Sequence, residues 1–331
     1  MQPFEYASPT TPDQAVQLLA ALPGSAVALA GGSDLLALMK DGIETPERLV
    51  NLKAIQEMRG IRDLPGGGFR IGALVTVAEL AANAGVRFEL PALSDAAGRV
   101  AGPQIRNVAT LGGNLCQRPR CWYFRNGFGL LPHLNGKSMV VEGDNRYHAI
   151  LGNEGPAAFV TPSTLAPLLI ALDAQLTLRG PNGERRLPLE QLFRIPATQG
   201  ETEHDLAPGE LITELTLGPA PAAGVRRVAS YEVRQRETLD WSLATASVAL
   251  EMDGAQVKRA RVVLGQVAPI PWVAADAERF LQGKAVDAGI IREAGEAAVH
   301  GAKALSRNAY KIQLARVAVQ RALRAAAGRE E

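Results

Sequence analysis

Two short glycine-bearing segments hold the residues best suited to binding chemistry in this chain. Residues 28–35 read Ala-Leu-Ala-Gly-Gly-Ser-Asp-Leu, and residues 109–114 read Ala-Thr-Leu-Gly-Gly-Asn. In each, a glycine pair stands beside small or hydroxylated residues, which lets backbone N–H groups come close to a phosphate. One such segment is a weak signal and is often only a turn. Two of them indicate a ligand with two phosphates, such as a dinucleotide.

The common signatures of other chemistries are missing. The chain has neither the GxGxxG fingerprint nor the G-x-x-x-x-G-K-[ST] motif, and it has no G-x-S-x-G nucleophile elbow. Its four histidines are scattered without the spacing of metal ligands, so we expect no metal site. No residue set forms a self-contained acid–base pair, so we predict no catalytic residue. The pattern favours a protein that holds a cofactor.

Composition limits the class of protein. The chain has 331 residues, of which 47% are hydrophobic and 21% charged, as in ordinary globular proteins of two or three domains. Its net charge of +1 gives no reason to expect nucleic acid or an anionic membrane as partner. No apolar run reaches the roughly 18 residues of a membrane-spanning helix. Residues 1–6 lack the pattern of a signal peptide, so we expect a cytoplasmic protein, with export beside a signal-bearing partner as the alternative.

The elements that must position the glycine segments follow from local patterns. Thr11 caps an expected helix over 11–22, a strand over 25–30 runs into the first segment, and a short helix over 35–40 follows it. Further along we expect strands over 49–52, 69–73, 159–160 and 176–178, helices over 77–83 (capped by Thr76), 91–101 and 165–172, and a loop over 198–210.

The pattern changes after residue 218. Residues 219–224, Pro-Ala-Pro-Ala-Ala-Gly, indicate a linker between domains. Strands are expected over 226–233, 246–252 and 257–264, with Gly254 in the turn between the last two, and helices follow over 274–281, 290–298 and 309–327. Strands first and helices afterwards favour an α+β fold.

The two segments also carry a family resemblance. Residues 30–40, then Ile71-Gly72-Ala73 with Thr76, and then residues 102–114 resemble the medium, FAD-binding subunit of the molybdenum hydroxylases. That family includes complexes like carbon monoxide dehydrogenase, xanthine dehydrogenase and aldehyde oxidoreductase. The resemblance implies an FAD-binding domain of the PCMH type over residues 1–218, with subdomains of about 1–58 and 59–218. A smaller domain of antiparallel sheet and helices would cover residues 225–328.

The resemblance also implies a set of cofactor-binding residues. The backbone of Leu29–Asp34 and of Thr110–Asn114 would cradle the FAD pyrophosphate, and Leu211 and Ile212 would contact its rings. Thr76 is as well explained as a helix cap. The full set implied is Leu29, Ala30, Gly31, Gly32, Ser33, Asp34, Leu35, Gly72, Ala73, Thr76, Gly102, Gln104, Ile105, Asn107, Ala109, Thr110, Gly112, Gly113, Asn114, Leu211 and Ile212.

The two cysteines bear on an iron–sulfur cluster. The run around Cys121, Arg-Cys-Trp-Tyr-Phe-Arg, resembles a subgroup in which a cysteine there joins three more in an inserted loop to hold a [4Fe–4S] cluster. Residues 126–147 contain no cysteine, and Cys116 cannot replace the missing three. We therefore expect a relative that lacks the cluster. The neighbouring Trp122, Tyr123 and Phe124 fit either a core or a partner interface.

Two departures from the family pattern concern the cofactor. Thr164 stands where relatives usually carry an aspartate that contacts FAD, and Glu232 stands where a lysine near the flavin is common. A hydroxyl is a weaker acceptor than a carboxylate. A glutamate should disfavour flavin reduction unless Arg234 or Arg236 compensates its charge; both arginines fit a solvated strand face equally well.

The implied function is electron transfer. A molybdopterin-binding large subunit would oxidise the substrate, [2Fe–2S] centres of a small subunit would pass single electrons on, and FAD in this chain would deliver them to a terminal acceptor. The alternatives are a freestanding flavin oxidase and a non-catalytic scaffold that has lost FAD. The sequence names neither the substrate nor the acceptor.

Overall fold

The first glycine segment leaves the end of a small parallel sheet. The computed structural model describes residues 1–219, 225–236 and 240–328, so most of the expected linker lies outside the described residues. Strands β1 (Glu5–Ala7), β3 (Arg48–Asn51) and β2 (Ala26–Leu29) lie in that order, all parallel. Helix α1 (Pro12–Ala20) begins at Thr11, whose side chain accepts from Gln14 N as expected. Because β2 ends at Leu29 and α2 (Leu35–Lys40) begins six residues later, residues 30–34 form a short connection in which only Ser33 is fully exposed.

A second, antiparallel sheet carries the rest of the N-terminal half. Its strand order is β4 (Ile61–Asp63), β5 (Phe69–Gly72), β10 (Leu211–Leu217), β8 (Gln175–Gly180), β9 (Gly183–Pro188). The helices that follow β5 in the chain are α3 (Val77–Ala82), α4 (Ala84–Glu89) and α5 (Pro91–Gly98). Thr76 caps α3 through a reciprocal capping box with Glu79. The helix expected over 91–101 ends at Gly98, and Ala101 has a φ of 43°, which no helix continues through.

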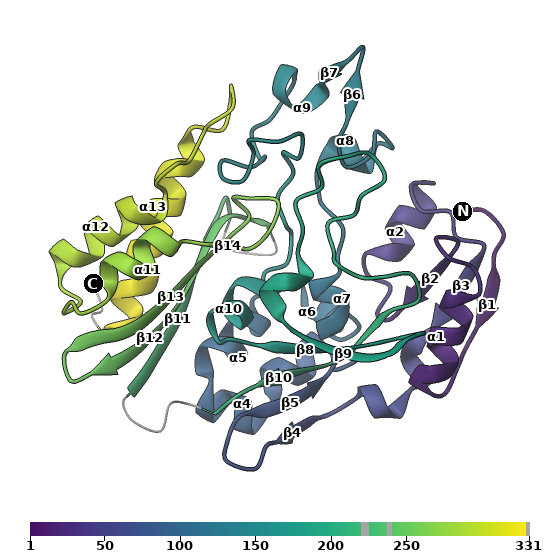
Figure 1. Ribbon diagram of the computed structural model, residues 1–331, viewed down its shortest axis with the longest axis horizontal. Coiled ribbons are helices and arrows are strands. Elements are labelled where there is room, and N and C mark those ends of the chain that lie inside the picture. Colours follow the sequence, from purple (N-terminus) through teal and green to yellow (C-terminus); the bar gives the residue numbers. More distant parts are fainter. Residues whose placement is uncertain (220–224, 237–239, 329–331) are drawn as a thin grey trace.

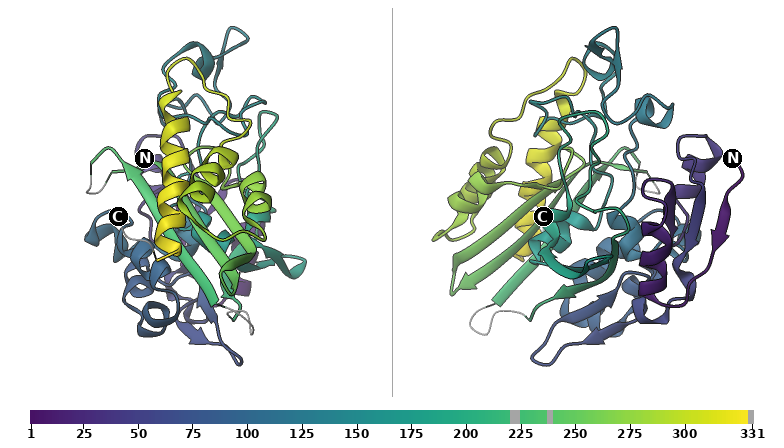
Figure 2. Two further views of the ribbon diagram at one scale, coloured as in Figure 1. Left: turned by 90° about the vertical axis from the view of Figure 1, so that its left-hand side faces the viewer. Right: turned by 45° about the vertical axis from the view of Figure 1, so that its right-hand side comes forward.

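The C-terminal sheet has a long strand, β12, that is buried on both faces. Strands β11 (Val225–Arg234), β12 (Ser242–Asp253), β13 (Gln256–Gly265) and β14 (Trp272–Val273) are antiparallel neighbours in that order. Helices α11 (Ala275–Leu281), α12 (Ala288–Ala298) and α13 (Tyr310–Ala326) cover one face (Figures 1 and 2). Along β12, Val248 and Leu250 join the core under these helices, whereas Ala249 joins the core of the N-terminal half. Two-sided burial explains the nearly continuous apolar run of this strand. The fold is therefore α+β.

A long, irregular segment projects from the body between α7 (Leu111–Leu115) and α10 (Ala166–Ala171) (Figure 1). It contains α8 (Trp122–Arg125), a small hairpin of β6 (His133–Leu134) and β7 (Lys137–Ser138), and α9 (Met139–Glu142). The strand expected over 159–160 is wrong: Phe159 is buried, but the residue pairs with no neighbouring strand. Within the described parts of the chain, no helix is both long and apolar enough to cross a membrane.

Buried polar contacts join the projecting segment to α13. Lys311 Nζ donates to the carbonyl oxygens of Tyr147, His148 and Gln266 at 3.1, 3.1 and 2.6 Å. Asn308 Nδ2 donates to the carbonyls of His148 and Ala149 at 3.2 and 3.1 Å. Burial lowers the pKa of Lys311 to about 7. These contacts fix residues 147–149 against the C-terminal sheet.

This junction predicts a pH dependence of stability. Burial, followed by repulsion from Lys311, lowers the pKa of His148 from 6.5 to about 4. The unfolded chain therefore binds a proton that the folded chain does not, so His148 destabilises the fold progressively as the pH falls from 6.5 to 4. The full effect is about 3 kcal/mol. Urea unfolding at about pH 7 and about pH 5 should show a smaller loss for His148→Gln than for the wild type; equal losses would contradict this assignment.

Candidate functional site

The two glycine segments touch one another. A Cβ built on Gly31 would lie 2.1 Å from Val108 O and 2.9 Å from Ala109 Cα, so only a glycine permits this approach. Gly32 has a φ of 75°, a left-handed conformation that favours glycine. Gly31 and Val108 are 77 positions apart in the sequence, yet their backbones are in direct contact. This contact is the centre of the candidate site.

The backbone amides of the two segments differ in what they donate to. In the second segment, Leu111 N donates to Val75 O, Gly112 N to Ala73 O and Gly113 N to Thr110 Oγ1. These glycines lie in the first turn of α7, capped by Thr110, rather than in a loop. By contrast, among the described residues none of the amides of residues 31–34 donates an intramolecular hydrogen bond. The N–H groups of the first segment are therefore free to bind an anion, whereas the second segment only forms one side of the site.

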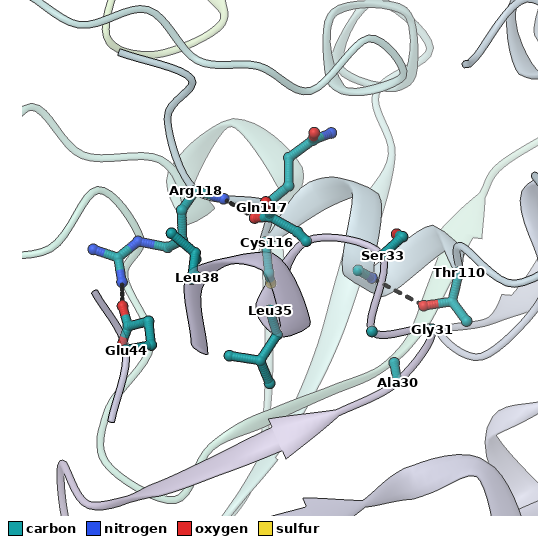
Figure 3. A pocket seen from close by; sticks show the side chains of 13 residues that line it. Ala30, Gly31, Ser33, Leu35, Leu38, Glu44, Thr110, Cys116, Gln117 and Arg118 are labelled. Atoms are coloured by element: carbon teal, nitrogen blue, oxygen red, sulfur yellow. Dashed lines mark hydrogen bonds and ion pairs between the residues drawn. The ribbon is translucent and has the colours of Figure 1, made fainter. Parts of the chain in front are cut away.

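Two hollows flank the contact between the segments. The first hollow has a volume of about 150 Å³ and is lined by residues 30–35, Leu38, Glu44, Thr110, Gly113 and residues 116–118 (Figure 3). The second hollow, of about 240 Å³, is lined by Ala30, Lys53, Arg59, Leu74, Thr76, Asn107, Val108 and Thr110. Ala30 and Thr110 line both. An extended ligand could therefore cross the glycine contact and occupy a hollow on each side.

Asp34 holds the projecting segment against the first hollow. Its carboxylate accepts from Arg118 N, Arg120 Nη1 and Arg125 Nη2, each at 2.8 Å. Arg118 in turn bridges Glu44 and Glu203 at 2.6 and 2.5 Å. These pairings occupy the Asp34 side chain, so a ligand would meet the backbone of this residue rather than its charge. Figure 3 shows Arg118 and Glu44 beside Leu38 and Cys116.

Two ionisable groups near the first hollow are electrically neutral. Burial, with a smaller contribution from Glu203, raises the pKa of Cys116 to about 12, so its thiol stays protonated. Burial likewise lowers the pKa of His204, whose ring nitrogen contacts Leu115 O at 3.1 Å. The protonated thiol of Cys116 is a poor nucleophile, and the Nε2 atom of His204 is engaged by a backbone carbonyl. The site is suited to binding, not to acid–base chemistry.

The predicted site residues fall into two groups. The hollows bring together Ala30 to Leu35, Thr76, Asn107, Thr110 and Gly113. Thr76 thus lines the second hollow while also capping α3. The other predicted residues line neither hollow. Five of them are buried beneath the surface: Leu29, Ala109, Asn114, Leu211 and Ile212. Three lie where backbones pack closely, Gly72, Ala73 and Gly112, and three lie at or on the short helix α6 (Pro103–Arg106), namely Gly102, Gln104 and Ile105.

Several lining residues escaped the sequence analysis. Lys53 and Arg59 place two cations at the second hollow, and Glu44 and Arg118 place an ion pair at the first. Their only sequence signal is a single charge in a connection between expected elements, which is too common to single them out.

Thr164, which lines neither hollow, carries a hydroxyl without a partner. Its Oγ1 is buried and has no hydrogen-bond partner. The neighbouring Ser163 is fully engaged: its Oγ donates to Asn114 Oδ1 at 2.8 Å and accepts from Ala166 N at 3.1 Å. Buried hydroxyl groups are normally hydrogen-bonded, so we expect a partner that the chain itself does not supply. It fits the presence of a bound group at the position where the family pattern has an aspartate.

Glu232 is neutralised inside the chain. Arg234 Nη2 donates to its carboxylate at 2.7 Å, and Ser242 Oγ at 2.5 Å, with the two charged side chains only 9% and 13% exposed. Arg236 instead pairs with Asp240 and is largely exposed. Of the two arginines considered, Arg234 therefore compensates the glutamate, and only Arg236 belongs to a solvated face.

Comparison with known proteins decides the family. Residues 2–221 match the family described as the FAD binding domain in molybdopterin dehydrogenase. The chain belongs to this family. Residues 229–326 match the C-terminal domain of the CO dehydrogenase flavoprotein. The chain is thus an oxidoreductase subunit of the molybdopterin dehydrogenase type, and its N-terminal part is an FAD-binding domain.

Individual relatives extend along most of the chain. The aldehyde oxidoreductase FAD-binding subunit PaoB of Escherichia coli K12 is 36% identical over 291 residues, 86% of this chain and 89% of that protein. The carbon monoxide dehydrogenase medium chain of Hydrogenophaga pseudoflava is 32% identical, covering 98% of this chain and 96% of that protein. The solved structure of carbon monoxide dehydrogenase from Hydrogenophaga pseudoflava matches with a TM-score of 0.77, 31% identity and full coverage of both chains.

Proposed function

We propose that this chain is the electron-transfer subunit of a molybdenum hydroxylase complex. A molybdopterin-binding large subunit would pass electrons to the [2Fe–2S] centres of a small subunit. These centres would then reduce the FAD of this chain. The observation that carries the proposal is the contact between Gly31 and Val108, with unengaged amides over residues 31–34 and a hollow on each side. A ligand made of two ring systems joined by a diphosphate matches that shape.

This chain's residues have separable tasks in the proposal. The amides of residues 31–34 bind the diphosphate, and Thr110 and Gly113 close the other side. Lys53 and Arg59 add positive charge at the second hollow, and Thr164 supplies a further hydrogen bond. When bound, the flavin takes up electrons singly and releases them as a pair. The protein orients it and keeps ionisable groups such as Cys116 protonated beside it.

The names of the relatives support a complex of several subunits. Two matched proteins are medium chains of carbon monoxide dehydrogenase, and another is the FAD-binding subunit of an aldehyde oxidoreductase. Since a medium chain implies companions of other sizes, we propose a large and a small partner here. A cytoplasmic location, with co-export as the alternative, belongs to the same proposal.

The scaffold alternative depended on Thr164 and Glu232. Neither residue argues against FAD binding, because Thr164 Oγ1 has no intramolecular partner and Arg234 compensates the charge of Glu232. The carboxylates that line the first hollow, Asp34 and Glu44, are both paired with arginines, so neither is placed to act as the base that a freestanding oxidase needs. Electron transfer is therefore the function that the geometry supports best.

The relay can be tested in the assembled complex. Substrate added without an acceptor should reduce the [2Fe–2S] centres, seen by electron paramagnetic resonance, and bleach the flavin absorbance. Adding acceptor should restore that absorbance. A chain that co-purifies with no iron–sulfur protein, or whose flavin stays oxidised while the iron–sulfur centres are reduced, would contradict the relay.

The orphaned hydroxyl of Thr164 gives a modest prediction. Thr164→Val keeps the shape but removes the hydroxyl, so FAD should bind roughly 5- to 10-fold more weakly, the value of one hydrogen bond. Equilibrium dialysis of FAD measures this. Folding stability should stay the same or rise slightly, because a buried unpaired oxygen is lost. Unchanged FAD affinity would show that Thr164 does not face the cofactor.

A further inference from the structure

One ion pair bridges the two walls of the first hollow. The wall that precedes β3 in the chain carries Glu44, and the wall that follows α7 carries Arg118. Arg118 Nη1 lies 2.6 Å from Glu44 Oε1. The walls also meet where the backbone of Gly31 touches that of Val108. Figure 3 shows Gly31 and the ion pair on opposite sides, with Cys116 between them. The hollow is therefore bounded by a backbone contact on one side and by two side chains on the other.

These two boundaries differ in how they can open. Separating Gly31 from Val108 requires two backbone segments to move apart. Arg118 and Glu44 can separate by rotation of their side chains alone. These side chains are 26% and 27% exposed, so water and salt ions reach the pair and weaken it. The ion pair is therefore the side on which the hollow opens most easily.

Arg118 is held on its own side of the hollow. Its Nε donates to Glu203 Oε1 at 2.5 Å, and its guanidinium lies 5.0 Å from the ring centre of Phe124. The Glu203 side chain is only 5% exposed, so the loss of Arg118 would leave a buried charge without a partner. Within the part of the chain that the structure describes, the Glu44 carboxylate has Arg118 as its only partner. Opening therefore releases Glu44 and leaves Arg118 in place.

We propose that the Arg118–Glu44 pair is a latch across the first hollow, which opens to admit or release the cofactor. For the identity of that cofactor, the inference rests on the proposed function. The latch is closed in the protein without ligand and closes again over the bound ligand, so it sets the rate of exchange and not the affinity. Glu44→Gln should speed the entry and the release of FAD by about 5-fold each and leave its dissociation constant within about twofold.

Labelling of Cys116 tests the latch without any cofactor. Cys116 lines the hollow and burial keeps its thiol protonated, so it should react with N-ethylmaleimide mainly when the hollow opens. In the full chain freed of FAD, Glu44→Gln should raise the labelling rate of Cys116 about 5-fold. Sodium chloride should raise the rate of the wild type and change that of the variant little. Mass spectrometry of the peptides separates Cys116 from Cys121, which lines a different cavity and should keep its rate.

The matched control is Glu5→Gln. Glu5 pairs with Arg48 at 2.8 Å in the N-terminal sheet, with side chains 56% and 16% exposed, and neither residue lines the hollow. This variant should label Cys116 at the wild-type rate. FAD release is followed by fluorescence while a phosphodiesterase cleaves the free FAD and so prevents rebinding. Release should be faster in Glu44→Gln and unchanged in Glu5→Gln.

Three outcomes would overturn the latch. Equal labelling of Cys116 in the wild type and Glu44→Gln would show that the pair does not close the hollow. A matching rise in the labelling of Cys121 would show that the whole projecting segment has loosened. A loss of FAD affinity as large as the gain in release rate would make Glu44 part of the binding site. Labelling of Cys116 that FAD does not slow would instead contradict the proposed cofactor site, whereas the latch is judged on the protein without FAD.

Discussion

Replacing Gly31 by alanine is expected to abolish the retention of FAD. The new Cβ would lie 2.1 Å from Val108 O and 2.8 Å from Val108 C, and both are backbone atoms that cannot rotate away. The two glycine segments must then separate, and overpacking of this kind costs about 1–3 kcal/mol of folding free energy. Because the amides of residues 31–34 would move with their segment, we expect FAD affinity to fall by roughly 100-fold or more.

The matched control is Gly98→Ala. Gly98 lies in α5, has no positive φ, and a Cβ there meets no atom within 4 Å. This variant should keep its FAD and be slightly more stable, since alanine favours helix. The flavin-to-protein ratio after gel filtration and the urea midpoint measure both variants. Full FAD retention by the Gly31 variant would place the cofactor elsewhere.

Removing the Asp34 carboxylate should produce the second-largest effect. In Asp34→Ala, Arg120 and Arg125 lose their shared partner in a region where these side chains are only 30% and 16% exposed. Breaking an ion pair of intermediate burial should cost about 2–3 kcal/mol, between the values for exposed and buried pairs. Residues 118–125 would loosen beside the first hollow, and FAD binding should weaken with them.

Urea unfolding measures the change in stability, and Asp13→Ala is its control. Asp13 also pairs with an arginine, Arg179, but the two side chains are 63% and 37% exposed. Its loss should cost less than about 1 kcal/mol. Similar losses in both variants would show that Asp34 is an ordinary surface pair and does not position the projecting segment.

Much of the fold could be predicted because its signals are local. The Thr11 and Thr76 caps, the strand before the first glycine segment and the three long C-terminal strands each follow from residues within one element. Elsewhere, contacts between distant parts of the chain decided the local structure. Gly112 and Gly113 are poor helix formers, yet they lie in α7 because Thr110 caps it and Gly112 N reaches Ala73 O.

The sequence pointed to the glycine residues of the candidate site but not to its charged residues. A glycine pair signals close backbone approach, and Gly31 indeed lies against Val108. Lys53, Arg59 and Arg118 join the hollows only because the chain folds back on itself over tens of residues. Similarly, no local pattern shows that Glu232 is neutralised by Arg234, since many such pairs remain solvated.

The most direct test of the account is the flavin content of the purified chain. A visible absorption spectrum, followed by denaturation and identification of the released flavin, should give one FAD per chain and no iron. A colourless protein that takes up no added FAD would contradict the account, because the free amides of residues 31–34 and both hollows would then have no ligand to explain them.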